Sequence, residues 1–326
     1  MKRIIGMGNA LVDIMTILED DDTLKHFGLP KGSMQLVDKD FSNKVLSGTK
    51  ELLKTQSSGG SAANTIHGLA RLGLPASFIG KVGKDDLGKF FSQDLINSNI
   101  KPEMILSNSE SGRAIALVSK DSERTFATFL GAAMEMNASD ITEQTFQGYS
   151  VFHVEGYLVQ NHELIEKALR LAKKSGLTTS LDMASYNVVE SNRDFLLHII
   201  KNYVDIVFAN EEEAKAFTSK GPEESLEILA AISAIAVVKL GEHGSLVRRG
   251  DEIVKIGVFP VKAIDTTGAG DLYASGFLYG LIMNCPLCVC GEIGALLSAH
   301  VIEVLGAKIP DDKWDMILQK VKELKE

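Results

Sequence analysis

The stretch Asp265-Thr-Thr-Gly-Ala-Gly-Asp271 predicts more of the fold than any other part of the chain, and Leu272-Tyr-Ala-Ser-Gly-Phe-Leu-Tyr279 follows it. Residues 253–264 alternate loosely between apolar and polar and predict a strand, whereas apolar residues recur at helical spacing after Asp271. Glycines let a backbone approach a ligand closely, and unpaired N–H groups at a helix start favour an anion. The N–H groups of residues 268–270 are therefore predicted to form an anion site where a strand turns into a helix.

Asp271 is the unusual residue of this stretch, because a carboxylate repels an anion bound beside it. The same carboxylate can accept a proton from a hydroxyl group that attacks the anion. An anion site with a base beside it is the minimum equipment for phosphoryl transfer to an alcohol. The alternative is a capped helix start with an acid in its first turn, which is ordinary.

Composition narrows the class of protein. The chain has 326 residues, 45% of them apolar, and a net charge of −9. No cluster of Lys and Arg is visible, so we expect no nucleic-acid partner. Residues 272–291 carry no charge, but Asn284-Cys285-Pro286 interrupts them and favours two core helices over a membrane span. With no leader-like segment at the N-terminus, we expect a cytoplasmic protein that makes no membrane contact.

Strands and helices alternate in the second half of the chain. Such alternation predicts a mainly parallel sheet with helices on both faces, an α/β fold. The expected elements are strands at 151–154, 178–182 and 206–209 and helices at 163–174 and 193–202. A further helix is expected at 294–306, and a charged closing helix at 312–326.

Several motifs together resemble those of the ribokinase-like (PfkB) carbohydrate kinases, with a pattern most similar to adenosine kinases. They are D-T-T-G-A-G-D at 265–271, G-M-G-N-A-L-V-D-I at 6–14, G-G-S-A-A-N at 59–64, N-E-E-E at 210–213 and V-V-K-L-G-E-H-G-S at 237–245. The resemblance covers the chain from end to end. It implies a single discontinuous α/β domain over residues 1–326, with the ATP site in its C-terminal part. It also implies a small β lid over the substrate, built from approximately residues 13–38 and 106–127.

The resemblance implies which residues bind the acceptor. In the family, an aspartate at the position of Asp13 accepts hydrogen bonds from two adjacent hydroxyls, and its two oxygens suit a diol. The resemblance gives the other acceptor roles to Gly59, Gly60, Asn64 and Tyr157. Adenosine kinases carry two aromatics in the stretch that matches Gly156-Tyr157-Leu158, so Leu158 here departs from that pattern.

On the phosphate side, the resemblance implies catalytic roles for Asp271, Arg124, Gly268, Ala269 and Gly270 and nucleotide contacts for Gly241, Thr266, Gly268 and Gly270. Asn210 and Glu213 would order Mg²⁺ through water. Three of these regions have an alternative interpretation. Arg124 could be an exposed hairpin arginine, and Asn210 with Glu213 could be only a capping box. Lys239, in the motif that contains Gly241, could be a solvated lysine. The cofactors expected are ATP and Mg²⁺, and the resemblance leaves room for a monovalent cation.

The predicted function is ATP-dependent phosphorylation of a primary hydroxyl on an adenosine-like nucleoside or a sugar, by a monomer or homodimer. One alternative is a sugar kinase of the ribokinase or fructokinase type. An alternative from another class is a non-catalytic regulator that binds nucleotides or nucleosides. The intact Gly268-Ala-Gly270-Asp271 sequence counts against the regulator, because a protein that only binds has no use for the base.

Overall fold

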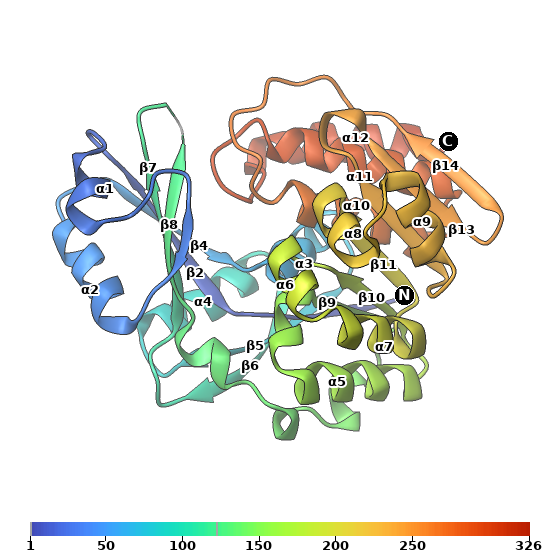
Figure 1. Ribbon diagram of the computed structural model, residues 1–326, viewed down its shortest axis with the longest axis horizontal. Helices are drawn as coiled ribbons and strands as arrows, with labels where there is room; N and C mark the ends of the chain where they lie inside the picture. Colours follow the sequence, from blue (N-terminus) through green and yellow to red (C-terminus); the bar gives the residue numbers. More distant parts are fainter. Residues whose placement is uncertain (1, 122) are drawn as a thin grey trace.

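The computed structural model describes residues 2–121 and 123–326, so Met1 and Ser122 lie outside the described residues. Ser122 belongs to the turn at 120–123 of a hairpin that the sequence predicts over residues 111–129. The described chain forms two sheets of very different size (Figure 1). The α/β class predicted from the sequence is confirmed.

The larger sheet has nine strands, and seven adjacent strands in it are parallel. In spatial order these are β6 (Ile100–Ser107), β5 (Ala76–Gly83), β1 (Ile4–Met7), β9 (Val151–Glu155), β10 (Thr178–Asp182), β11 (Ile206–Asn210) and β12 (Ile235–Lys239). Two antiparallel strands, β13 (Ser245–Arg249) and β14 (Glu252–Ile256), complete one edge. Strands buried on both faces explain the continuous apolar runs in the sequence.

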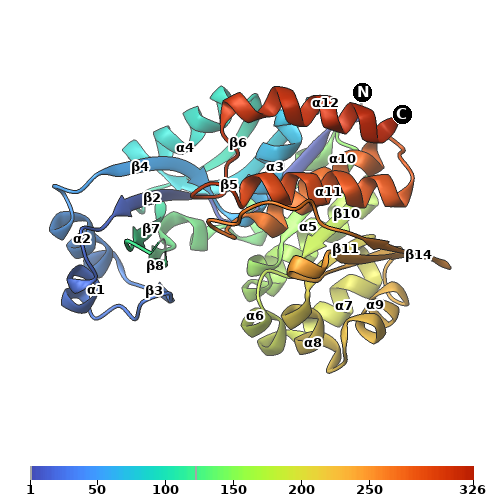
Figure 2. The same ribbon diagram turned by 90° about the horizontal axis from the view of Figure 1, so that it is seen from above.

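Helices cover both faces of the large sheet (Figure 2). One face packs against α3 (Ser61–Arg71), α4 (Asp86–Asn97), α10 (Ala269–Ile282), α11 (Leu287–Val301) and α12 (Trp314–Lys325). The other packs against α5 (His162–Lys174), α6 (Tyr186–Ser191), α7 (Arg193–Tyr203), α8 (Glu211–Thr218) and α9 (Pro222–Ala230). Each face therefore has its own apolar core. No helix among the described residues is long and apolar enough to cross a membrane.

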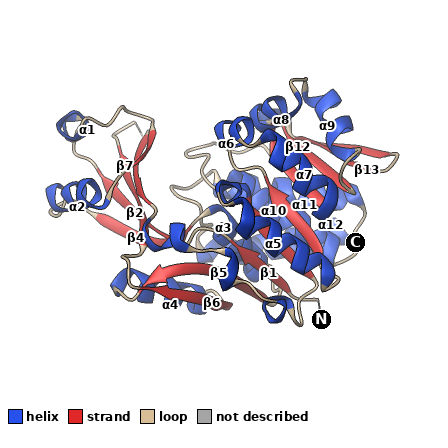
Figure 3. Cartoon of the chain, turned by 60° about the horizontal axis from the view of Figure 1, so that its bottom comes forward, coloured by secondary structure: helices blue, strands red, loops and turns tan. Residues whose placement is uncertain are grey.

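The smaller sheet stands apart from the large one (Figure 3). Its five strands, in spatial order, are β3 (Met34–Leu36), β8 (Arg124–Phe129), β7 (Gly112–Val118), β2 (Leu11–Ile17) and β4 (Lys54–Gly59). Two helices, α1 (Asp22–Phe27) and α2 (Lys39–Gly48), pack with a small apolar cluster on one face of this sheet. Its other face carries Asp13 and Ala114, which are opposite each other in the β2–β7 pairing, and turns toward the large sheet. Strand β4 lies outside both segments expected for the lid.

Two predicted elements have different bounds in the structure. The strand expected at 253–264 ends at Ile256, because β14 is an edge strand and Pro260 has no N–H to continue a ladder. An irregular loop of residues 257–268 therefore separates this strand from α10. The helix expected at 294–306 is α11, which begins at Leu287 behind Pro286 and ends at Val301. Gly306 has a φ of 90° and lies in the loop beyond it.

Candidate active site

Strand register brings polar side chains together at the carboxyl ends of the parallel strands. Glu155 lies opposite Asp182, and Asn210 lies opposite Lys239. Because side chains alternate along a strand, all four share the face that packs against α3 and α10. Ligands of open α/β sheets bind beyond this edge. The candidate site is therefore the space between these strand ends and the starts of α3 and α10.

Asp271 lies in the first turn of α10 and is held by two residues of α3. Its Oδ1 accepts a hydrogen bond from Ser61 Oγ at 2.7 Å, and its Oδ2 accepts one from Asn64 Nδ2 at 2.9 Å. Burial raises the pKa of Asp271 to about 6, although the Ser61 and Asn64 bonds oppose the shift by favouring the charged form. Asp271 is thus a carboxylate of fixed orientation that titrates just below neutral pH.

Asn64 has an unused acceptor. Its side chain is 6% exposed, and its Oδ1 is buried without a hydrogen-bond partner among the described residues. A buried polar atom without a partner is rare in folded proteins, because it loses its bond to water. The Asn64 carbonyl oxygen is therefore suited to receive a donor from a ligand, beside Asp271.

Asp13 lies on strand β2, on the face of the small sheet that is turned toward the candidate site. Its carboxylate occupies the space that a side chain on Gly59 would need, since a Cβ at Gly59 would lie 2.2 Å from Asp13 Oδ2. Burial raises the pKa of Asp13 to about 7, Lys308 and Arg124 lower it, and Asp271 raises it. Gly60, at the start of α3, has a φ of 101° and passes so close to the Asn9 carbonyl that only glycine fits.

Arg124 lies at the start of β8 and reaches across to the loop before α10. Its Nη2 donates to Asp265 Oδ1 at 2.5 Å, and the two side chains are only 9% and 4% exposed. Asp265 also accepts hydrogen bonds from the N–H groups of Thr267 and Gly306. The alternative of an exposed hairpin arginine is thus wrong, because Arg124 is buried in an ion pair between the small sheet and the glycine-rich loop.

The glycine-rich loop differs in one respect from the sequence prediction. The Ala269 N–H donates to the Thr266 carbonyl at 3.2 Å, so it is not free for an anion. Within the described parts of the chain, the N–H groups of Gly268 and Gly270 have no such partner. Gly268 has a φ of 75° and packs against Ala307, so a side chain there would clash. The predicted anion site therefore has two free N–H groups instead of three.

Asn210 and Glu213 form the capping box expected at the start of α8. The Glu213 N–H donates to Asn210 Oδ1, and Glu213 in turn accepts from the Asn210 N–H and Nδ2, each at 2.8 Å. Burial raises the pKa of Glu213 to about 7, Asp182 raises it further, and Lys239 opposes the shift.

The donor chemistry of this region suits Mg²⁺, which prefers oxygen ligands and usually keeps several waters. Glu213 is 2% exposed, and both its carboxylate oxygens accept hydrogen bonds from Asn210. Asn210 and Glu213 therefore fit a metal that is bound through water and not by direct contact. No group of three His, Cys, Asp or Glu side chains in the described ranges could hold a metal directly. Mutual repulsion between Glu213, Asp182 and Asp271 is the kind of electrostatic strain that a divalent cation relieves.

Two cavities lie near Asp271. The first, of about 820 Å³, is lined by Gly60, Ser61 and Tyr157 together with many apolar side chains. The second, of about 520 Å³, is lined by Gly241, Thr266 and Gly270. Asp271 is next to both, because its hydrogen-bond partner Ser61 lines the first cavity and its neighbour Gly270 lines the second.

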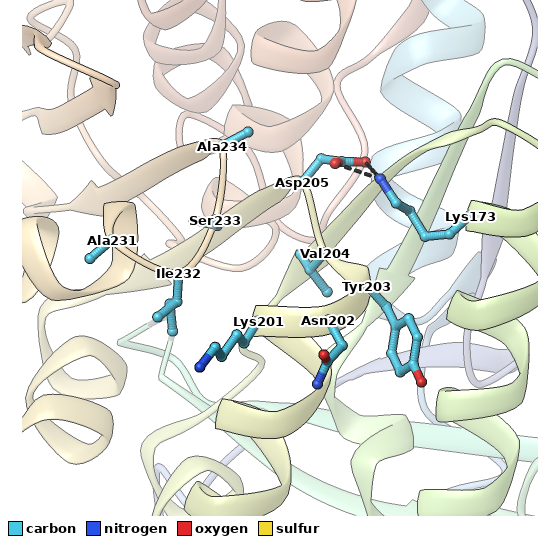
Figure 4. A pocket seen from close by; sticks show the side chains of 10 residues that line it. All are labelled: Lys173, Lys201, Asn202, Tyr203, Val204, Asp205, Ala231, Ile232, Ser233 and Ala234. Carbon is cyan, nitrogen blue, oxygen red and sulfur yellow. Dashed lines mark hydrogen bonds and ion pairs between the residues drawn. The ribbon is translucent and has the colours of Figure 1, made fainter.

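A third pocket, shown in Figure 4, lies at the opposite edge of the large sheet, just before β11 and β12 begin. Its only charged pair among the described residues that line it is Lys173 with Asp205, joined by hydrogen bonds of 2.7 and 2.9 Å. This pocket shares no residue with the two cavities near Asp271.

Sequence reasoning gave no role to three residues of the site, Ser61, Glu155 and Asp182, and it left Lys239 open, with a solvated lysine as the alternative. Glu155 is 1% exposed and accepts hydrogen bonds from the N–H and Nδ2 of Asn9 and from the Ala62 N–H, at 2.8–2.9 Å. It thereby joins the end of β1 to the start of α3. The available signal for Glu155 was an acid as the last residue of an apolar strand; Asp182 also ends its strand, but that strand is rich in Thr and Ser and gave a weaker signal.

Comparison with known proteins agrees with this geometry. The model of the pfkB family of carbohydrate kinases matches residues 46–314. The structure of a probable sugar kinase from Rhizobium etli is 31% identical, with a TM-score of 0.88 over 99% of both chains. That of adenosine kinase from Sinorhizobium meliloti is 33% identical, with a TM-score of 0.87 over 98% of this chain and 99% of that one. A 5-dehydro-2-deoxygluconokinase from Clostridium botulinum is 29% identical over 280 residues, 80% of this chain and 82% of the relative. The chain therefore belongs to the pfkB family of carbohydrate kinases and is a phosphotransferase with an alcohol acceptor.

Proposed function

We propose that this enzyme transfers the terminal phosphoryl group of ATP to the primary hydroxyl of a ribonucleoside such as adenosine. The observation that carries the proposal is the position of Asp271, a carboxylate of raised pKa next to residues that line two cavities. The acceptor occupies the larger cavity and ATP the smaller one. Gly241, Thr266, Gly268 and Gly270 contact the ATP phosphates in this arrangement.

The chemistry assigned to Asp271 is general-base catalysis. The acceptor hydroxyl donates its proton to the carboxylate, a new bond forms from the hydroxyl oxygen to phosphorus, and the bond from phosphorus to the departing ADP oxygen breaks. Since the transition state of phosphoryl transfer is loose, positioning and charge neutralisation contribute more than the base alone. Arg124, which is paired with Asp265 in the loop before α10, and the Gly268 and Gly270 N–H groups supply positive charge there.

Two features in and beside the larger cavity favour a nucleoside over a free sugar. Asp13 and the unpaired Asn64 Oδ1 together provide acceptors for adjacent ring hydroxyls. Beyond them the cavity continues between Tyr157, Leu158 and Leu130, where a free sugar has nothing to bury. A flat base fits such an apolar slot, and stacking on an aromatic side chain is worth about 1–3 kcal/mol. Leu158 in place of a second aromatic is the feature least like adenosine kinases.

The small sheet is proposed to act as a lid on this cavity. Its cleft-facing row, from Leu36 through Thr128 and Ala114 to Asp13, supplies one wall. Asn210 and Glu213 would hold Mg²⁺ through water, and the ion would neutralise charge on the phosphates. The cap fixes the orientation of Glu213, so its charge is presented to the metal shell without direct coordination.

The test is ATP consumption measured against a panel of ribonucleosides, 2′-deoxyribonucleosides, ribose and hexoses. We expect adenosine or a related purine ribonucleoside to give the highest kcat/KM. A hexose with much higher kcat/KM than any ribonucleoside would refute the acceptor assignment and support the sugar-kinase alternative.

A substitution at Asp13 tests the diol contact directly. Asp13→Ala should reduce kcat/KM for the ribonucleoside far more than for its 2′-deoxy analogue, because the analogue lacks one of the two hydroxyls. Sites built to bind a hydroxyl discriminate by up to about 10⁴–10⁵-fold against analogues without it. Equal losses on both substrates would show that Asp13 does not bind the 2′-hydroxyl.

A further inference from the structure

We infer that Lys239 is a catalytic residue that binds the terminal phosphates of the donor, and that Asp182 is the residue that positions it. The inference rests on the proposed function, because it requires ATP in the cavity lined by Gly241 and Gly270. It adds to the glycine-rich loop a fixed cation on the sheet side of the anion site.

The first argument is where the ammonium lies. Lys239 is the last residue of β12, and its side chain also lines the smaller cavity. A Cβ placed on Gly270 would lie 2.9 Å from Lys239 Nζ. The ammonium therefore lies directly against the backbone of the anion site, and the missing side chain of Gly270 is what makes room for it.

The second argument is that the ammonium has donors to spare. A lysine ammonium has three N–H donors. In the described ranges, Lys239 Nζ makes one hydrogen bond, to Asp182 Oδ2 at 2.7 Å. The two side chains are 14% and 8% exposed, so little water reaches the pair. The remaining donors are thus held beside the cavity with no protein acceptor.

The third argument concerns charge. Burial lowers the pKa of Lys239, but the carboxylates of Asp182, Glu213 and Asp271 outweigh burial and raise it, so the lysine is charged. A pair that served stability alone would need only one acid for one base, and buried pairs often add little to stability. Here one cation lies among three carboxylates at the edge where the proposed phosphates and metal bind.

Asp182 also ties the lysine to the acceptor side. Its Oδ1 accepts from the Ala184 N–H at 3.1 Å, and Ala184 has a φ of 74°, which is rare for a residue other than glycine. The Tyr157 hydroxyl donates to the Ala184 carbonyl at 3.4 Å. The loop after β10 thus connects Lys239, at the proposed ATP phosphates, to Tyr157, which lines the acceptor cavity.

The experiment compares the binding of ATP and AMP, each with Mg²⁺ and without acceptor, by isothermal titration calorimetry. Lys239→Met alone leaves Asp182 as a buried, unpaired charge, so the double variant Asp182→Asn/Lys239→Met is measured as well. A charged hydrogen bond to the phosphates corresponds to about 10- to 100-fold in affinity. We expect ATP to lose that much in both variants and AMP to change less than about threefold.

Lys173→Met is the matched control. Lys173 makes a similar ion pair with Asp205 at the opposite edge of the same sheet (Figure 4), so its removal should leave ATP affinity unchanged. If the folded double variant keeps the preference of the wild type for ATP over AMP, the role of Lys239 is refuted and the proposed function stands. If the wild type itself does not bind ATP, the proposed function fails first.

Discussion

The pH dependence of turnover is the most direct test of the role given to Asp271. Its pKa is about 6, and a general base must be unprotonated, so kcat/KM should rise with pH through that value. A group of pKa about 6 is roughly 91% ionised at pH 7 and roughly 9% at pH 5, so the rate should fall about tenfold between them. Asp271→Asn should remove this limb and reduce turnover by about 10²–10⁴-fold, while ATP still binds.

Ser61→Ala sharpens the test, because Ser61 touches Asp271 through the Oγ–Oδ1 bond of 2.7 Å. A hydrogen bond to a charged group is worth about 1.5–3 kcal/mol, and one pKa unit corresponds to about 1.4 kcal/mol. Loss of the Ser61 hydroxyl should therefore move the acidic limb upward by about one to two units.

Steady-state kinetics from pH 5 to pH 9 measures both effects. Ser275→Ala is the control, since its hydroxyl donates to the backbone carbonyls of Thr65 and Asp271 and not to the carboxylate. The pKa values of Asp13 and Glu213 are also raised to about 7, but neither forms a hydrogen bond with Ser61 among the described residues, so their limbs should stay in place. An unmoved limb in Ser61→Ala, or less than a tenfold loss in Asp271→Asn, would refute the assignment of the base.

Three further predictions concern metal use and stability. Glu213→Gln keeps a hydrogen-bond acceptor for the capping box but loses the negative charge, so the Mg²⁺ concentration that gives half the maximal rate should rise. A lower Tm with unchanged Mg²⁺ dependence would show that Glu213 has only the capping role. Asp13 has a pKa near 7 in the folded state against 3.8 as its ordinary value, so unfolding free energy should fall as pH rises between these values. Asp13→Asn should reduce that slope in urea titrations, leaving the part that the raised pKa values of Glu213 and Asp271 contribute, and stabilise the protein at pH 8 by at most about 4 kcal/mol, with no gain at pH 4. Gly276→Ala should destabilise by about 1–3 kcal/mol, because its Cβ would meet the α11 backbone at 2.5 Å, whereas the open position Gly257→Ala should change little.

Much of the fold could be predicted from the sequence, because local patterns determined it. The alternation of apolar strands and amphipathic helices after residue 150 predicted the parallel sheet, and Pro286 marked the break between α10 and α11. The strand at 54–59 was missed, because Lys54-Thr-Gln-Ser-Ser-Gly59 has few apolar residues. It pairs with β2, and that pairing, not its own sequence, makes it a strand.

The site was predictable where a motif placed a residue, and not where the contact is made by distant segments. Asp271, Asn64 and Asp13 belong to recognisable motifs. The Ser61–Asp271 and Arg124–Asp265 contacts join residues 210 and 141 positions apart, so no local pattern announces them. From the sequence alone, Lys239 could also be a solvated lysine, because only the pairing of β12 with β11 shows which way its side chain points.

The edge of the large sheet has a consequence for which changes in the chain can be tolerated. Asp182 and Lys239 reach the site because each ends its strand on the α3–α10 side. Side chains alternate strictly, so one residue removed from the interior of β10 or β12 would turn that last side chain toward α5 and α8. One residue removed from the irregular loop at 257–268 would shorten only a connection. The lengths of these strands should therefore stay fixed, and length changes should be tolerated in the loops.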